Sequence, residues 1–158
     1  MDSNTRQDPS NISEWFWGII DSAQGRPAQL TTHLRLLSNN DLYHFAIEFM
    51  FAADLLCKDS IIDQMEYASE DNILDFSHWA VSQGKGFYYS LWSEPQLVAT
   101  YPGSSKASST NLHAIAESVL EERTGEWPED IIDIWDDFGE SPYSSTSKYW
   151  ETRERNNS

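Results

Sequence analysis

Three polar residues, Asp41, His44 and Glu48, are the first candidates for chemistry in this chain. Spacings of three and four residues bring side chains onto neighbouring rows of one helix face. A histidine between two carboxylates at this spacing could bind a metal ion, or act as a general acid and base. The alternative is that all three are solvated groups opposite the apolar stripe of the same helix, and we favour it because such groups are ordinary there.

The other histidines and the single cysteine are not arranged like the ligands of a metal or catalytic site. His33, His78 and His113 have no second ligand at a diagnostic spacing, so we expect surface or hydrogen-bonded helix residues. Cys57 lies in the apolar run FAADLLC, which predicts a small buried side chain. One cysteine excludes an internal disulfide bond and a cysteine-rich zinc site. No nucleophile elbow or zinc-helix motif occurs, and we predict no catalytic residue, metal or cofactor.

A second acidic set consists of Glu70, Asp71 and Asp75. The first two fall in the first turn of a predicted helix, where carboxylates gain roughly 0.3–1 kcal/mol from the helix dipole. This capping role is the simpler interpretation. The alternative is a recognition or cation site that includes Gln83 or Trp79.

The densest negative charge lies in the stretch Gly125–Glu140, GEWPEDIIDIWDDFGE, which has seven carboxylates and no basic residue. Its large apolar residues recur three to four positions apart, so one helix would carry acids and apolar groups on opposite faces. We predict that the partner-binding residues lie here, with the second acidic set beside them. The predicted contacts are Asp130, Asp133, Trp135, Asp136 and Asp137, followed by Glu70, Asp71 and Asp75.

Charge is strongly unbalanced along the whole chain of 158 residues. Asp and Glu number 26 against 10 Lys and Arg, giving a net charge of −16. Residues 41–75 hold nine acids against Lys58, and residues 117–140 hold ten against Arg123. If these stretches pack side by side, they form a continuous negative surface that would attract a basic partner. Direct binding to nucleic acid would need a basic patch, which the sequence does not offer.

Helical spacing of apolar residues recurs through most of the chain. Serines at 13, 38 and 69 are predicted N-caps, and Pro27 suits the first turn of the second helix. The helix after Ser38 carries a broad apolar stripe and is expected to be the central one; the stripe comprises Leu42, Phe45, Phe49, Ala52, Ala53 and Leu56. Strand alternation is weak throughout. The fold class is therefore all-α.

Further helices are expected over 59–67 and 69–84, over the segment SEPQLVATY, from Thr110 or Asn111 to Gly125, and from Pro128 onward. The segment from 86 towards Pro95 is expected to be a helix or a turn. We predict a single compact domain of about seven to nine helices. Residues 12–140 form the helical domain, 1–11 a flexible N-terminus and 141–158 a polar tail. No apolar run approaches about 18 residues and no signal-like segment is present, which predicts a soluble, cytoplasmic protein.

One run, SEDNILDFSHWAVSQGKGFYYSLWSEPQLV, resembles the pattern S-D-D-x-F-x-x-F-R-x-W-L-I-x-Q-G of bacterial proteins in domain of unknown function 4240. The matching residues are Ser69, Asp71, Phe76, Trp79, Gln83, Gly84 and Pro95. The flanks EWFWGIID and AESVLEERTGEWPED are also similar, so the resemblance spans about Ile12 to Asp130. It departs at QMEYAS, where the family is often apolar. The resemblance implies a compact helical domain and no particular reaction.

These features favour a non-enzymatic, acidic module that binds and neutralises a basic protein, such as a nuclease toxin or a DNA-binding protein. It would act as an immunity protein or a nucleic-acid mimic does, with no direct contact to nucleic acid or membrane. One alternative is a small metal-dependent enzyme or regulator that uses Asp41, His44 and Glu48. Another is a scaffold or regulatory domain whose charge serves only solubility. The sequence leaves the oligomeric state open.

Overall fold

The computed structural model describes residues 9, 12–65, 69–101 and 112–125, and within them it contains eight helices and no strand. The helices are α1 (Glu14–Ala23), α2 (Pro27–Leu34), α3 (Asn39–Leu55), α4 (Asp59–Ile62), α5 (Glu70–Ser82), α6 (Lys85–Ser93), the 3-10 helix η3 (Pro95–Thr100) and α8 (Ile115–Thr124). The predicted all-α class and number of helices are confirmed.

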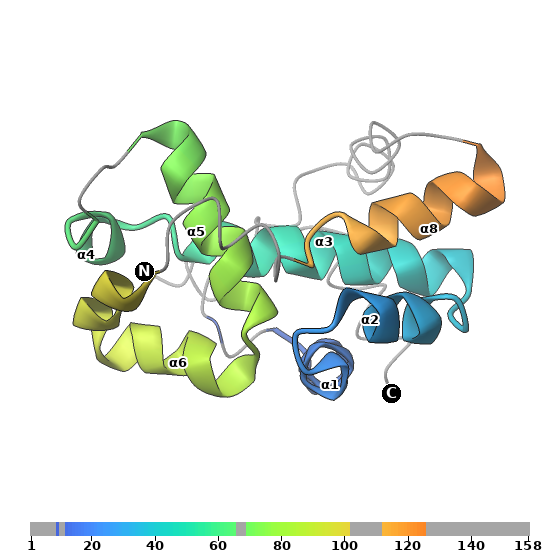
Figure 1. Ribbon diagram of the computed structural model, residues 1–158, viewed down its shortest axis with the longest axis horizontal. Coiled ribbons are helices and arrows are strands. Elements are labelled where there is room, and N and C mark those ends of the chain that lie inside the picture. Colours follow the sequence, from blue (N-terminus) through green and yellow to red (C-terminus); the bar gives the residue numbers. More distant parts are fainter. Residues whose placement is uncertain (1–8, 10–11, 66–68, 102–111, 126–158) are drawn as a thin grey trace, which may run out of the picture.

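Helix α3 runs through the middle of the molecule (Figure 1). It packs against α1, α5 and α8, while α2 packs against α1 and α8. On the other side, α6 contacts α1, α5 and η3. Residues are buried around nearly the whole circumference of α3, as a central helix requires. All six apolar positions predicted for its stripe are buried.

Capping residues fix where the helices begin. The hydroxyls of Ser13, Ser38 and Ser69 each accept a hydrogen bond from a backbone N–H in the first turn of α1, α3 and α5. Each bond satisfies a donor that the helix itself leaves free. The three serine N-caps predicted from the sequence are therefore confirmed, as is Pro27 in the first turn of α2.

Aromatic residues from different helices join α1, α3 and α6 in the core. The ring of Phe16 lies 5.0 Å from that of Phe45, and the ring of Trp17 lies 5.0 Å from that of Tyr88. The buried hydroxyl of Tyr88 donates a hydrogen bond of 2.7 Å to the carbonyl oxygen of Ala52. This bond ties α6 to α3 and satisfies a polar group that would otherwise cost stability.

Two predicted helix boundaries are wrong. The helix expected from Thr110 or Asn111 begins at Ile115, because residues 112–114 form a turn in which Leu112 is buried. The helix expected over 59–67 ends as a single turn at Ile62. At Leu112, an apolar residue that matched the helical period is buried by tertiary packing instead. The helix predicted from Pro128 lies outside the described residues.

Candidate functional site

The solvent-facing side of α5 gathers acidic residues around an exposed leucine. Glu70 and Leu74 form one row of the helix, and Asp71 and Asp75 form the next. Glu70 and Asp71 are exposed, Asp75 is half-buried, and the side chain of Leu74 is 49% exposed. We call these four residues the α5 acidic face. The opposite side of α5 packs into the core through Phe76, Ser77 and Ala80.

Local structure explains why the acids stand at this end of the helix. Ser69 caps α5 by accepting from the backbone N–H of Asn72 at 3.2 Å, and Glu70 and Asp71 occupy the first turn. Carboxylates there interact favourably with the positive end of the helix dipole. The capping interpretation of these acids therefore describes their local role. Leu74 has no part in capping, and its exposed side chain adds an apolar group to the same face.

Within the described residues, the basic side chains nearest in sequence to the α5 acidic face contact other groups. The sequence has no Lys or Arg between Lys58 and Lys85. The ammonium of Lys58 lies over the ring of Trp92, 3.5 Å from its centroid, and partial burial lowers the pKa of this lysine. Lys85 pairs with Glu14 at the start of α1. Within the described part of the chain, no ion pair includes an acid of the α5 face.

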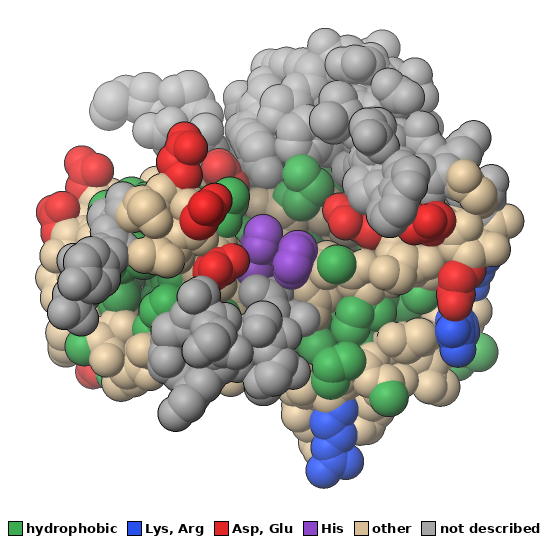
Figure 2. Space-filling model, turned by 45° about the horizontal axis from the view of Figure 1, so that its top comes forward, with side chains coloured by type: hydrophobic (Ala, Val, Ile, Leu, Met, Phe, Trp, Pro, Cys, Tyr) green, Lys and Arg blue, Asp and Glu red, His purple; other side chains and the backbone are tan. Residues whose placement is uncertain are grey.

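Acids of α5 and α8 lie on one side of the molecule. Figure 2 shows Asp and Glu side chains on both sides of a pair of adjacent histidines. On α8, Glu117 and Glu121 are half-buried, and desolvation raises the pKa of Glu117. Elsewhere on α8, Glu122 is bonded to Arg35, with 2.9 Å between Nη2 and Oε1. The negative surface predicted to extend beyond residue 125 stays a prediction, because Asp130, Asp133, Trp135, Asp136 and Asp137 lie outside the described residues.

The histidine pair consists of His78 on α5 and His113 in the turn before α8. Their rings are nearly parallel, at 7°, with centroids 4.2 Å apart. Burial lowers the pKa of His78 to about 4, with a further contribution from the charge of His113. Burial also lowers the pKa of His113, while Asp75 acts in the opposite direction. Both rings are therefore uncharged at neutral pH. His113 is exposed, as expected of a surface residue, and His78 is half-buried. Their contact was not expected from the sequence, and it arises because the turn before α8 brings His113 onto α5.

The Asp41, His44 and Glu48 set is not the solvated group expected from the sequence. His44 and Glu48 are buried, while Asp41 is half-buried at the start of α3. The Glu48 carboxylate accepts hydrogen bonds of 2.9 Å from both the backbone N–H and the hydroxyl of Ser13. It thereby holds the N-terminus of α1 against α3. Among the residues that the structure describes, no group of three or more His, Cys, Asp and Glu could hold a metal ion.

Cys57 was predicted to be buried, and this is wrong. Cys57 follows the end of α3 and is exposed. Its Sγ atom lies 3.5 Å from the hydroxyl oxygen of Ser77. Partial desolvation raises the pKa of the thiol, so it is predominantly protonated at neutral pH. The apolar run FAADLLC ends inside the core at Leu56, one residue earlier than the pattern suggested.

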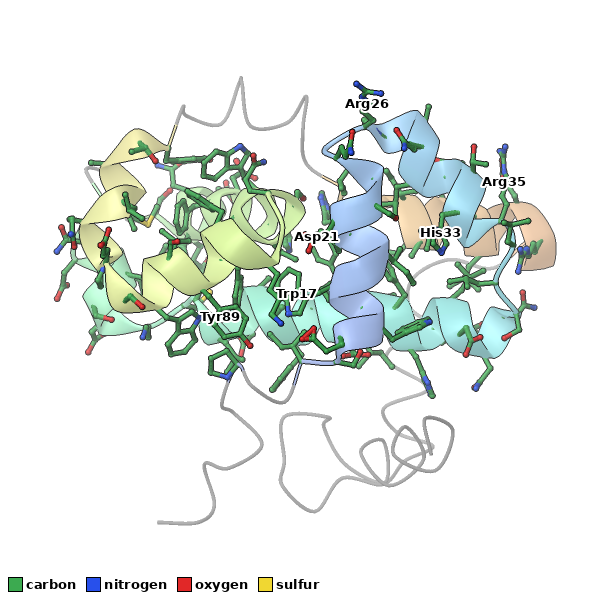
Figure 3. The ribbon with its side chains drawn as sticks, turned by 90° about the horizontal axis from the view of Figure 1, so that it is seen from below. Trp17, Asp21, Arg26, His33, Arg35 and Tyr89 are labelled. Atoms are coloured by element: carbon green, nitrogen blue, oxygen red, sulfur yellow. The ribbon has the colours of Figure 1, made fainter. Side chains whose placement is uncertain are left out.

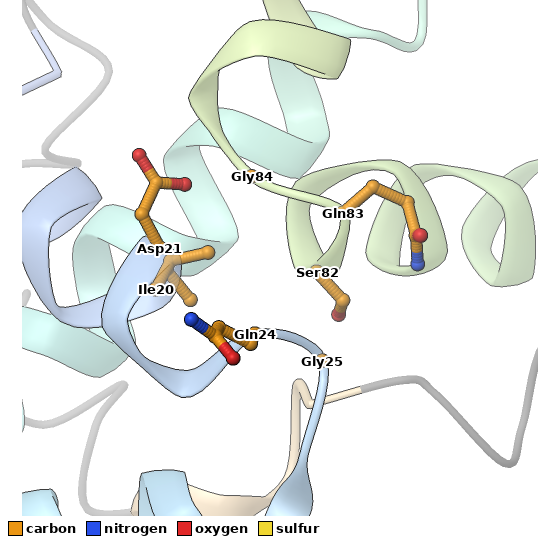
Figure 4. A pocket seen from close by; sticks show the side chains of 7 residues that line it. All are labelled: Ile20, Asp21, Gln24, Gly25, Ser82, Gln83 and Gly84. Atoms are coloured by element: carbon orange, nitrogen blue, oxygen red, sulfur yellow. The ribbon is translucent and has the colours of Figure 1, made fainter.

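A small pocket of about 190 Å³ opens where α1, α5 and α6 meet (Figure 4). Its polar groups already hold helix ends together. Asp21 accepts a 3.0 Å hydrogen bond from the N–H of Lys85 and so caps α6, whose N-cap Gly84 has no side chain to do this. The Ser82 hydroxyl donates to the carbonyl of His78 and accepts from the N–H of Leu112. We therefore assign this pocket to the framework of the fold.

Comparisons with known proteins add no assignment: no family model, no curated protein and no solved structure matches the chain. The resemblance to domain of unknown function 4240 accordingly stays a prediction. No helix in the described ranges is long and apolar enough to cross a membrane.

Sequence reasoning identified the acids of α5 but missed Leu74 and the histidine pair. A helical projection places Leu74 on the same side as Glu70 and Asp71, so its exposure could have been predicted from the sequence. The contact of His78 with His113 had no sequence signal, because 35 positions separate them and only the fold joins them.

Proposed function

We propose that the protein is an acidic binding module that captures and neutralises a basic protein, in the manner of an immunity protein or a nucleic-acid mimic. The observation that carries the proposal is the α5 acidic face, in which carboxylates outside every described ion pair surround an exposed leucine. We propose that the protein binds this partner in the cytoplasm, and we expect it to make no direct contact with nucleic acid.

Charge and apolar surface would contribute differently to the encounter. A net charge of −16 supports a long-range field that accelerates association with a basic partner by about 10- to 1000-fold. Leu74 would supply an apolar contact that becomes desolvated in the complex and slows dissociation. The partner that fits is therefore a basic surface with an apolar residue at its centre. We infer that Asp130, Asp133, Trp135, Asp136 and Asp137 extend the same binding surface.

The first test separates the α5 acidic face from net charge alone. The partner is identified by affinity capture with the wild-type chain at physiological salt, then purified for Kd measurements. The test variant is Glu70→Gln, Asp71→Asn and Asp75→Asn. The control is Ala28→Lys, Thr32→Lys and Ala99→Lys, which changes the net charge by the same +3 at exposed positions on α2 and η3.

We expect the test variant to weaken binding by at least about tenfold and the control by less than about threefold, because complementary charge acts most strongly at the contact surface. Equal weakening would mean that only the overall field matters. Unchanged binding of the test variant would contradict a role for the α5 acidic face. Replacing Asp133, Asp136 and Asp137 by Lys tests the inferred extension of the binding surface. Undiminished capture of the partner would show that these residues are not part of that surface.

A further inference from the structure

The His78–His113 pair fastens the beginning of α8 to α5. The two rings stack 4.2 Å apart, and the neighbouring residue Leu112 is fully buried. The N–H of Leu112 donates a 2.8 Å hydrogen bond to the Ser82 hydroxyl at the end of α5. Between described residues, a ring stack and a hydrogen bond therefore join the turn that leads into α8 to α5.

Among the residues that the structure describes, the groups facing the pair from α3, α5 and α8 carry little charge that could stabilise protonated rings. From α3 it meets the ring of Phe49, whose centroid is 6.1 Å from that of His78. From α5 it meets the carboxylate of Asp75, which acts on His113. On α8 the nearest acid along the chain is Glu117, half-buried and itself harder to ionise because of desolvation. Of the described groups named here, Asp75 is the one that opposes the cost of charging two rings in contact.

We propose that this stacked pair is an acid-sensitive latch that holds the start of α8 on α5 at neutral pH and releases it when the rings take up protons. Two imidazolium ions stacked 4.2 Å apart repel each other, and the half-buried His78 ring loses part of the hydration that its charged form would need. Opening would separate the acids of α5 from those of α8. That consequence rests on the proposed function, whereas the latch itself does not.

The direction and size of the effect follow from proton linkage. A ring whose pKa is depressed in the closed state binds its proton more tightly once the latch opens, so protons favour opening. For His78, a pKa of about 4 when closed and 6.5 when open predicts a roughly twentyfold rise in the opening equilibrium between pH 7 and pH 5. Asp75 works against this for His113, so the main contribution comes from His78.

Amide hydrogen exchange of residues 112–120 in the partner-free chain tests the latch. After correction for the intrinsic dependence of exchange on pH, the wild-type segment should exchange about 20-fold faster at pH 5 than at pH 7. The variant His78→Phe with His113→Phe keeps two stacking rings without titratable nitrogens, and its ratio should stay below about threefold. His33→Gln, on the separate helix α2 (Figure 3), should behave as the wild type does.

Equal exchange of the wild-type segment at both pH values would overturn the latch. An NMR titration of the wild-type imidazoles gives a second measure that does not depend on the variants folding. A His78 pKa well below 6.5 supports the latch, and one at or above 6.5 overturns it. These outcomes are independent of partner binding, so the latch can fail while the acidic module survives, and the reverse also holds.

Discussion

Arg123 near the end of α8 and Glu70 at the start of α5 are both exposed charged residues, but their surroundings differ. Arg123 donates to the backbone carbonyls of Leu37 and Arg35 and to the side chain of Asn39, and so closes the connection between α2 and α3. Glu70 lies next to Asp71 and Leu74 and belongs to no ion pair between described residues.

The difference separates charges that hold the fold from charges that are available to a partner. Arg35 pairs with Glu122 at the end of α2 (Figure 3), and Asp21 caps α6, so these charges join elements that are distant in sequence. Among the described residues, the acids of the α5 face form no ion pair with another element, although the charge of Asp75 acts on His113. With only ten basic residues in the chain, those used to close helix ends are no longer available to neutralise α5. Three mutations test this division, in order of the expected effect on stability.

The largest effect is expected at Glu48. Its replacement by Ala leaves the N–H and hydroxyl of Ser13 without their acceptor and opens a void beside α3, which should cost about 3 kcal/mol of unfolding free energy. Glu48→Gln retains one acceptor oxygen and should cost about half as much. Glu94→Ala, at an exposed position, is the control and should stay within about 0.5 kcal/mol. Urea unfolding at pH 7 measures all three, and a harmless Glu48→Ala would contradict the role given to this carboxylate.

A smaller loss is expected at Gly84, where α5 turns into α6. Its φ of +102° suits glycine alone, and a Cβ there would lie 2.5 Å from the Asp21 oxygen that caps α6. Gly84→Ala should therefore destabilise the protein by about 2 kcal/mol. Gly86→Ala, two residues on, meets nothing within 4 Å inside α6 and should stabilise by roughly 0.5–1 kcal/mol. Thermal unfolding of the pair gives the comparison, and similar effects of both changes would show that the turn is not constrained.

The smallest effect on stability is expected on the α5 acidic face. The variant Glu70→Gln, Asp71→Asn and Asp75→Asn should change the unfolding free energy by less than about 0.5 kcal/mol, because losses at the helix dipole and relief of repulsion nearly cancel. Raising the salt concentration should reduce even that difference. The unfolding free energies of the variant and the wild type, measured at low and high salt, test this prediction. A loss above about 2 kcal/mol would mean that these acids hold the fold, and the division between the two kinds of charge would be wrong.

The helical fold could be predicted from the sequence because its signals are local. The serine caps, Pro27 and the apolar stripe of α3 each act within a few residues of where they stand. The same signals failed where burial was decided by distant elements. Cys57 follows an apolar run yet is exposed, and His44 and Glu48 are polar yet buried against α1. Local periodicity predicts which side of a helix faces the core. It does not predict how far the ends of the helix extend into the core.

The all-α class, the starts of the main helices and the excess of negative charge could be inferred from the sequence alone, since these depend on composition and on contacts within one or two turns. Which charges are used inside the molecule and which remain exposed depends on how the helices pack. Glu48 meets Ser13 across 35 positions, and His78 meets His113 across the same number. Contacts at that separation leave no periodic trace in the chain, because they arise from how whole helices pack.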